Sequence, residues 1–251
     1  MQELFDSAKD NLGFLLVCLL VFVGLFLVAK VYEHFVMKRD RRVSHARYIA
    51  YIAVFGALAG ALMFLEIPLF FAPSFYEIDL SEIPIMICTF YLGPVAGVTT
   101  ELVKILVKLL LKGTSTAFVG DFANFVVGCT FVLPASMLYH AKKTKRVALY
   151  GCILGTACMT AFGSLFNAVY LLPKFAQLFG MPLDAIIGMG TRVNGAITSV
   201  STLVLFAVVP FNLVKGVIIT LLTFLLYKRV EKNIFLRAKH MPREALGKSG
   251  T

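Results

Sequence analysis

"VVPFNLVKGVIITLLTFLLYKR" covers residues 208–229 and is an apolar run that also contains Asn212 and Lys215. These two residues are three positions apart, so they share one face of any helix that forms here. Burying an amide and an ammonium group in hydrocarbon is costly unless both groups meet polar partners. The stretch therefore predicts a membrane-spanning helix with polar contacts on one face.

The composition of the whole chain favours an integral membrane protein. Of its 251 residues, 59% are hydrophobic and 15% are charged, whereas about 25% are charged in soluble domains. The net charge of +10 comes from short basic segments beside apolar runs, which is the positive-inside pattern and excludes nucleic acid as the expected partner. The cysteines lie in apolar runs without C-x-x-C spacing, so no metal site is expected.

Seven apolar segments are candidate membrane helices, since a span needs about 20 residues. They are residues 12–31, 46–65, 83–93, 95–111, 118–139, 147–171 and 209–229. The third segment is short for a span, and a semi-polar stretch between Pro173 and Pro210 is expected to form an external helix or lid. The N-terminal flank of the first segment holds Glu3, Asp6 and Asp10 instead of a basic region, and no cleavage site follows it, so it is expected to be a membrane helix and not a signal peptide.

Charge sets the expected orientation. The basic segments 38–47, 142–146 and 228–239 belong in the cytoplasm. The stretch 66–84 holds four carboxylates and neither Lys nor Arg, so it belongs outside. If seven spans cross the membrane in turn, with the basic segments in the cytoplasm and the acidic stretch outside, the N-terminus lies outside and the C-terminus in the cytoplasm.

Polar residues from several spans are expected at a similar depth in the outer half of the membrane, counted at about 1.5 Å per residue. They are Lys108, Asn124, Asn167, Asn212 and Lys215. An acidic loop, residues 76–82, is expected to fold over them and adds Asp79 and Leu80 as candidates. Aromatic residues nearby suit a flat ligand. The alternative is that each polar residue is isolated and either snorkels to the interface or joins two helices.

Small residues recur every four positions in residues 46–65. Ala53, Ala57 and Ala61 form one stripe, and Gly56 and Gly60 form another beside it. Small residues at this spacing let two helices approach closely in lipid. The stripes therefore indicate either packing within the bundle or a docking face for a second membrane protein.

Catalytic signatures are missing from the sequence. There is no Walker A motif, H-E-x-x-H or G-x-S-x-G, and no carboxylate-rich core is expected. An enzyme is therefore not expected, although a membrane enzyme and a membrane scaffold without a ligand stay open as alternatives.

Several motifs resemble one family of membrane proteins. They are "LEIPL" (65–69), "IDLSEIP" (78–84), "FYLGPVAG" (90–97), "ELVKILVKLL" (101–110), "GDFANFVVGCTFVLPA" (120–135) and "VVPFNLVKG" (208–216). With these motifs the sequence resembles the substrate-binding S subunits of energy-coupling-factor (ECF) vitamin transporters, and among them most the riboflavin-specific ones. The resemblance covers about residues 46–230.

The resemblance implies an all-α membrane fold built on a six-helix S-subunit bundle, residues 39–236. An extra N-terminal helix and basic linker (1–38) precede this bundle, and a polar cytoplasmic tail (237–251) follows it. The resemblance also implies capture of riboflavin as cargo, with no cofactor, and partnership with a transmembrane coupling protein and two cytoplasmic ATPases. Asn212, Lys215 and Asn167 match the family's substrate-binding positions. The alanine stripe matches its docking surface. FMN, or another vitamin or heterocycle, stays open as the ligand.

Overall fold

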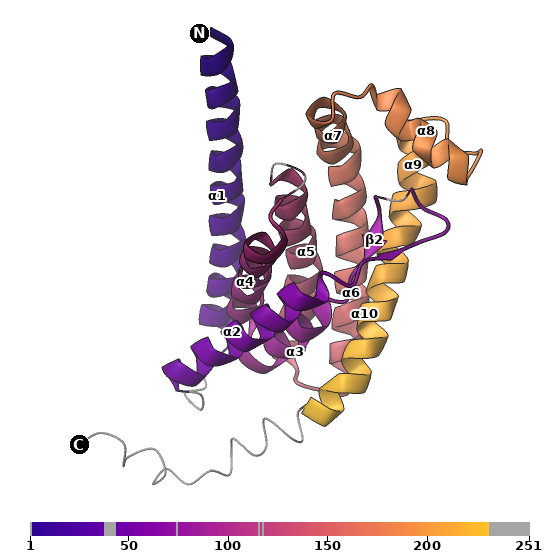
Figure 1. Cartoon of the computed structure of the whole chain (residues 1–251). Helices are drawn as coiled ribbons and strands as arrows, with labels where there is room; N and C mark the ends of the chain where they lie inside the picture. The colour runs from indigo at the N-terminus through magenta and orange to yellow at the C-terminus, as the bar shows by residue number, and fades with distance from the viewer. Residues whose placement is uncertain (1, 38–43, 74, 115, 117, 231–251) are drawn as a thin grey trace.

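The computed structural model describes residues 2–37, 44–73, 75–114, 116 and 118–230, and helices make up most of it (Figure 1). The helices are α1 (Gln2–Val36), α2 (His45–Leu62), α3 (Glu82–Leu92), α4 (Pro94–Lys112), α5 (Val119–Ala141), α6 (Lys145–Phe166), α7 (Leu172–Leu178), α8 (Leu183–Val193), α9 (Val200–Leu203) and α10 (Val209–Val230). Two π-helical segments, η1 (Asn167–Leu171) and η2 (Val204–Val208), join α6 to α7 and α9 to α10. Two short antiparallel strands, β1 (Ile67–Pro68) and β2 (Glu77–Ile78), pair between α2 and α3.

Five described helical stretches are long and apolar enough to cross a membrane: residues 16–36, 45–62, 119–141, 145–178 and 200–226. The apolar helix α3 is short, as expected, with 11 residues. The 19 residues of α4 include one Glu and three Lys, and the Glu and one of these Lys are buried inside the bundle. The predicted all-α membrane fold is confirmed.

Pro173 and Pro210, expected at helix boundaries, lie inside continuous helical stretches. The helix through Pro173 continues to Leu178, and the helix through Pro210 begins at Val200. Each proline follows a π-helical segment. A proline lacks an N–H donor and its ring crowds the carbonyl four residues earlier, so a locally widened helix lets the chain continue. The expected limits 147–171 and 209–229 are therefore wrong, because neither proline ends its helix.

A helix between the last two long stretches was expected and is present as α8. Ile186 of α8 is buried in one apolar cluster with Ala72, which lies between β1 and β2, and with Leu203 of α9. In Figure 1, α8 lies at the same end of the bundle as α7 and α9. The connection thus covers the hairpin loop from one side.

Close packing of α2 on α4 uses the glycine stripe. A Cβ atom at Gly56 would lie 2.5 Å from the side chain of Val103, and one at Gly60 would lie 2.6 Å from that of Val107. Only glycine permits this approach. Internal packing is therefore the role of the two glycines, whereas the alanine stripe beside them is exposed.

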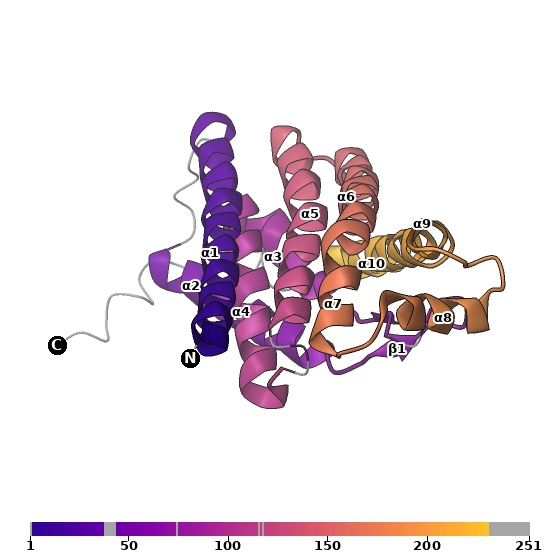
Figure 2. The same ribbon diagram turned by 90° about the horizontal axis from the view of Figure 1, so that it is seen from above.

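The N-terminal helix α1 packs against α4 and α5, at the edge of the bundle away from α10 (Figure 2). Glu33 Oε1 accepts a hydrogen bond of 2.9 Å from the Val95 N–H at the start of α4. The Tyr32 hydroxyl donates to the Met137 carbonyl of α5. The partition of residues 1–38 as a separate unit stays a prediction. Residues 38–43 of the linker and the tail 237–251 lie outside the described residues.

Candidate functional site

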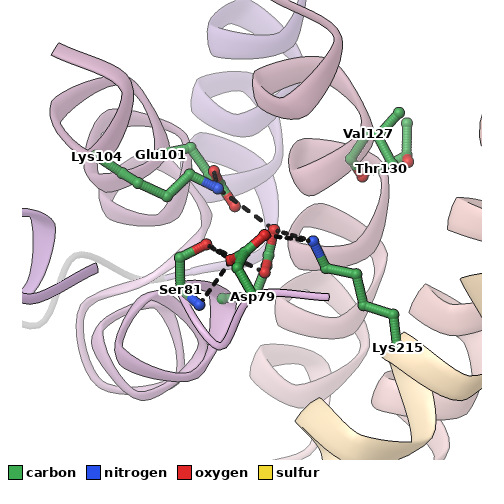
Figure 3. A network of polar contacts seen from close by, with 8 residues as sticks. Asp79, Ser81, Glu101, Lys104, Val127, Thr130 and Lys215 are labelled. Carbon is green, nitrogen blue, oxygen red and sulfur yellow. Dashed lines mark hydrogen bonds and ion pairs between the residues drawn. The ribbon is translucent and has the colours of Figure 1, made fainter. Parts of the chain in front are cut away.

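Lys215 of α10 is buried and forms ion pairs with two carboxylates. Its Nζ atom lies 3.1 Å from Asp79 Oδ2 and 3.2 Å from Glu82 Oε1. Asp79 follows β2 and Glu82 opens α3, so the acidic loop reaches the last helix. Figure 3 shows the Lys215 side chain extending from its helix toward Asp79. The loop thereby supplies the partners that a buried ammonium group requires.

A second buried lysine, Lys104 of α4, shares Glu82 with Lys215. Lys104 Nζ lies 3.3 Å from Glu82 Oε1 and 2.7 Å from Glu101 Oε2. We call these five side chains the buried charge cluster: Asp79, Glu82, Glu101, Lys104 and Lys215. The expectation that the interior has no carboxylate-rich core is wrong, because paired lysines make it possible to bury the carboxylates.

Asp79 is fixed by the turn into α3 as well as by the lysines. The Ser81 N–H donates to Asp79 Oδ1 at 2.9 Å, and the Ser81 hydroxyl bonds to the same oxygen. Burial disfavours the charged carboxylate, but the Lys215 and Lys104 ammonium groups and the Ser81 hydrogen bonds outweigh it. The pKa of Asp79 therefore lies below its usual range. Asp79 also lies just before α3, where the helix dipole favours negative charge.

Asn167 and Asn212 meet at Gly163 of α6. Asn167 Nδ2 donates to the Gly163 carbonyl at 2.8 Å, and a Cβ atom at Gly163 would lie 3.2 Å from Asn212 Nδ2. Asn212 Nδ2 also donates to the Val208 carbonyl at 3.1 Å. Both asparagines are buried. Gly163 therefore lies beside both amides: its carbonyl accepts from Asn167, and its lack of a side chain leaves room for Asn212.

Tyr76 connects the asparagine pair to the acidic loop. Its hydroxyl donates to Asn167 Oδ1 at 2.8 Å, and its ring centroid is 5.4 Å from that of Phe211 on α10. Phe75 lies beside it, with ring centroids 4.6 Å apart. Leu80, a candidate from the sequence, is half-buried and packs against the apolar core. The loop therefore contacts Asn167 and Lys215, two of the five polar residues that it is expected to cover.

Two residues that the sequence marks as site candidates, Lys108 and Asn124, lie apart from the buried charge cluster. Lys108 pairs with Asp121 near the start of α5 and donates to the Gly113 carbonyl at 3.0 Å. Asn124 has a buried Oδ1 atom without a hydrogen-bond partner among the described residues. No described contact joins either side chain to the buried charge cluster.

The helices that carry Lys215 and Asn167 extend past the prolines from which the depth of these residues is counted in the sequence. At about 1.5 Å per residue, Lys215 lies roughly 22 Å along the axis from Val200, and Asn167 roughly 16 Å from Leu178. The common depth of the polar residues in the membrane stays a prediction. In the structure, both side chains contact the acidic loop, Lys215 at Asp79 and Asn167 at Tyr76.

Three members of the buried charge cluster, Glu82, Glu101 and Lys104, were not among the expected site residues. The sequence does carry a signal for two of them, because Glu101 and Lys104 stand three residues apart in an apolar helix. Such a spacing places opposite charges side by side on one helical face. No comparable pattern marks Glu82, whose partners come from two other helices, α4 and α10.

The proposed docking residues Ala53, Ala57 and Ala61 are exposed along α2. They lie beside the glycines that pack on α4, so the stripe is turned away from that contact. This arrangement leaves the alanines accessible to another membrane helix. Docking on this stripe stays a prediction.

Comparison with known proteins identifies a family. The family model for "ECF transporter, substrate-specific component" matches residues 47–227. The riboflavin transporter RibU of Staphylococcus aureus is 30% identical over 193 residues, which cover 77% of this chain and 95% of that protein. The riboflavin transporter FmnP of Bacillus subtilis is 28% identical over 181 residues, which cover 72% of this chain and 90% of that protein.

Two further similarities extend this result. The riboflavin transporter RibU of Streptococcus thermophilus is 28% identical over 229 residues, which cover 90% of this chain and 95% of that protein, so this match reaches into α1. A solved structure, described as the S component of a bacterial ECF transporter, matches with a TM-score of 0.60 and 32% identity over 77% of this chain and 99% of that chain. The predicted resemblance is confirmed, as is the expectation of a multi-pass membrane protein that is not an enzyme. The chain belongs to the family of substrate-specific components of ECF transporters.

Proposed function

We propose that this chain captures riboflavin, or a closely related flavin, from outside the cell for an ECF importer. Its relatives named as riboflavin transporters support this substrate, because the matches cover most of the chain. The observation that carries the proposal is the convergence of Lys215, Asn212 and Asn167 beneath one loop. The flavin would be cargo and not a resident cofactor.

The hydrogen-bonding capacity of Lys215 supports a role in ligand binding. An ammonium group has three donors. Lys215 donates to Asp79 Oδ2 and forms an ion pair with Glu82. The third donor would bind a carbonyl oxygen of the ligand. The two ion pairs also restrict the side chain, so less conformational entropy is lost when the ligand binds.

Asn212 and Asn167 complement the lysine. An amide side chain offers both a donor and an acceptor, and the uracil-like edge of a flavin presents carbonyls beside one N–H. Tyr76, whose hydroxyl donates to Asn167, and Phe211, whose ring lies beside that of Tyr76, provide aromatic surfaces suited to a flat ring system. The mixture of polar groups and rings fits a flavin better than a purely ionic substrate.

The proposed partners are a transmembrane coupling protein and two cytoplasmic ATPases, together forming an ECF module. The exposed alanine stripe of α2, at Ala53, Ala57 and Ala61, supports docking of the coupling protein. ATP hydrolysis by the module would then drive release of the bound flavin to the inside. The chain itself carries no nucleotide-binding motif of the Walker type.

The proposed orientation has the N-terminus outside and the C-terminus in the cytoplasm. In Figure 1, α1, α5 and α10 end on the same side of the bundle. The basic segment 142–146, which joins α5 to α6 and includes the first two residues of α6, lies on this side and supports a cytoplasmic assignment. The hairpin loop and α8 would then face the outside, where the flavin is captured.

The proposal is tested by titrating riboflavin into the purified full chain in detergent. We expect binding of one riboflavin per chain with quenching of flavin fluorescence, and mass spectrometry of the purified protein should identify any flavin that is retained. Folded protein that does not quench micromolar riboflavin would reject the flavin proposal. Co-purification of a different heterocycle would redirect it to another substrate of the same transport class.

A further inference from the structure

One carboxylate oxygen joins the two lysines of the buried charge cluster. Glu82 Oε1 lies 3.3 Å from Lys104 Nζ and 3.2 Å from Lys215 Nζ. The other oxygen, Oε2, lies 3.3 Å from the Ser81 hydroxyl, whose single proton is also directed at Asp79 Oδ1. Any rotation of the Glu82 side chain would change its distances to both lysines. The position of Lys215 therefore depends on how firmly Glu82 is held.

Lys104 is held independently of Lys215. Glu101 lies 2.7 Å from Lys104 Nζ, and neither side chain has any exposed surface. Glu101 itself is confined by α5, because a Cβ atom at Gly128 would lie 2.6 Å from Glu101 Oε1. Figure 3 shows Glu101 and Lys104 on one side of Asp79 and Lys215 on the other. Lys104 thus provides a fixed cation on α4 against which Glu82 can be oriented.

The buried charge cluster holds more carboxylates than ammonium groups. Three carboxylates share two ammonium groups, and Glu82 is the carboxylate that both ammonium groups approach. Without Lys104, Glu82 would have Lys215 as its remaining cation and would compete with Asp79 for it. Lys215 would shift toward Glu82, and its third donor would point in a new direction. In a binding site, a misdirected donor lowers affinity even though the charge is still present.

We propose that Lys104, anchored by Glu101, is a positioning residue for substrate binding: it orients Glu82 and thereby directs the free donor of Lys215. This role rests on the proposed function of Lys215 as a riboflavin contact. Lys104 acts through Glu82 and does not itself need to touch the flavin. Helix α4 would therefore influence the affinity for the flavin, although Lys104 and Glu101 of this helix do not touch the ligand.

The test removes the anchored pair together, so that the charge balance is preserved. In Lys104→Met/Glu101→Gln one cation and one anion disappear, and Asp79, Glu82 and Lys215 are retained. We expect the riboflavin Kd to rise by about tenfold, a typical coupling between contacting residues. In a Lys215→Met background the same double substitution should have no further effect, because its target is gone. An unchanged Kd in the first case, or an additive loss in the second, overturns the proposal.

A matched control comes from the same helix. Lys112 pairs with Glu66 at 2.7 Å, and both side chains are well exposed. Lys112→Met/Glu66→Gln makes the same chemical changes in an exposed pair, which contributes little to stability. The riboflavin Kd of this variant should equal that of the unmodified chain. A comparable loss in the control would show that the buried variant reports a general effect and would overturn the assignment.

A second readout does not use riboflavin. Acetic anhydride labels free amines, and mass spectrometry of the peptide that contains Lys215 reports its rate of labelling. We expect slower labelling of Lys215 in Lys104→Met/Glu101→Gln, because only the unprotonated amine reacts and Lys215 then pairs with Asp79 and Glu82 without a second cation nearby. Labelling of exposed Lys145 should be unchanged. Equal Lys215 rates would overturn the positioning role. Slower labelling in a chain that never binds riboflavin would instead reject the proposed function and leave the positioning of Lys215 supported.

A milder variant covers the case in which the double variant does not fold. Glu101→Gln keeps the size of the side chain and weakens only the anchor of Lys104. Both readouts should change in the same direction as for the double variant, by a smaller factor. If neither the Kd nor the labelling rate of Lys215 changes, the anchor has no influence on the site and the proposal fails.

Discussion

Asp79 Oδ2 and Lys215 Nζ lie 3.1 Å apart and join the loop after β2 to the last helix. The side chains are 8% and 9% exposed, so each charge depends on the other for compensation. Removing one partner of a buried pair strands the other charge in a medium that solvates it poorly. Any motion of the loop away from α10 must therefore break this pair or carry Lys215 with it.

Lys215→Met should lower riboflavin affinity by about 10- to 150-fold, the loss expected for one charge-assisted hydrogen bond of roughly 1.5–3 kcal/mol. Methionine keeps an apolar stem of similar length and removes all three donors. Fluorescence titration measures the change. An unchanged Kd would remove this lysine from the site.

The same substitution should also lower thermal stability, because Asp79 and Glu82 lose a shared cation. Adding Asp79→Asn removes one stranded charge and should recover part of the melting temperature. It should not recover the lost affinity. A lysine that merely reached the membrane surface would give the opposite result for stability, since methionine would then be neutral or stabilising.

The sequence alone marks Lys215, Asn212 and Asn167 as candidates, because a polar side chain in an apolar helix requires a polar partner. It does not mark Glu82, whose ion pairs are with lysines of two other helices, α4 and α10. Periodicity reports which face of a helix is polar. It carries no information on which loop will cover that face.

The limits of the last two long helices were predicted less well for a local reason. Proline is a strong signal for a helix end, and Pro173 and Pro210 were read in this way. The π-helical segments before them remove the steric conflict. Such segments leave little trace in the residue pattern, so the lengths of these helices required the structure.

Gly163→Ala should weaken riboflavin binding without reducing stability. The new methyl group would lie 3.2 Å from Asn212 Nδ2, which forces the amide to shift, whereas alanine is favoured over glycine within a helix. Parallel flavin titrations and thermal melts separate the two effects. Gly188→Ala on α8 is the control, since nothing lies within 4 Å of its new Cβ atom. Equal affinity in both variants would argue against a role for the position of Asn212.

Ala57→Leu should leave riboflavin binding intact and weaken association with the coupling protein. A leucine on the exposed alanine stripe holds a partner helix at a distance. Co-purification with an ECF module in membranes measures the association. Gly56→Leu, one residue earlier, should instead destabilise the chain itself, because a Cβ atom there already lies 2.5 Å from Val103. Full assembly of Ala57→Leu would reject the alanine stripe as the docking face.

Removal of residues 1–37 should reduce thermal stability and leave the riboflavin Kd nearly unchanged. Ala29 of α1 is buried in one apolar cluster with Val98 of α4 and Phe125 of α5, so the deletion exposes this surface. The site at Lys215 lies on α10, at the other edge of the bundle (Figure 2).

The Glu33→Gln substitution isolates one part of this effect. It retains the shape of the side chain at the Val95 N–H but removes a negative charge from the start of α4, where such a charge contributes about 0.3–1 kcal/mol. The melting temperature should therefore fall slightly in Glu33→Gln and more in the deletion, with flavin titrations superimposable on those of the full chain. A deletion variant that inserts normally and melts at an unchanged temperature would show that α1 contributes nothing to the bundle. One that keeps its fold but no longer binds riboflavin would show that α1 supports the site through α4, the helix that carries Lys104.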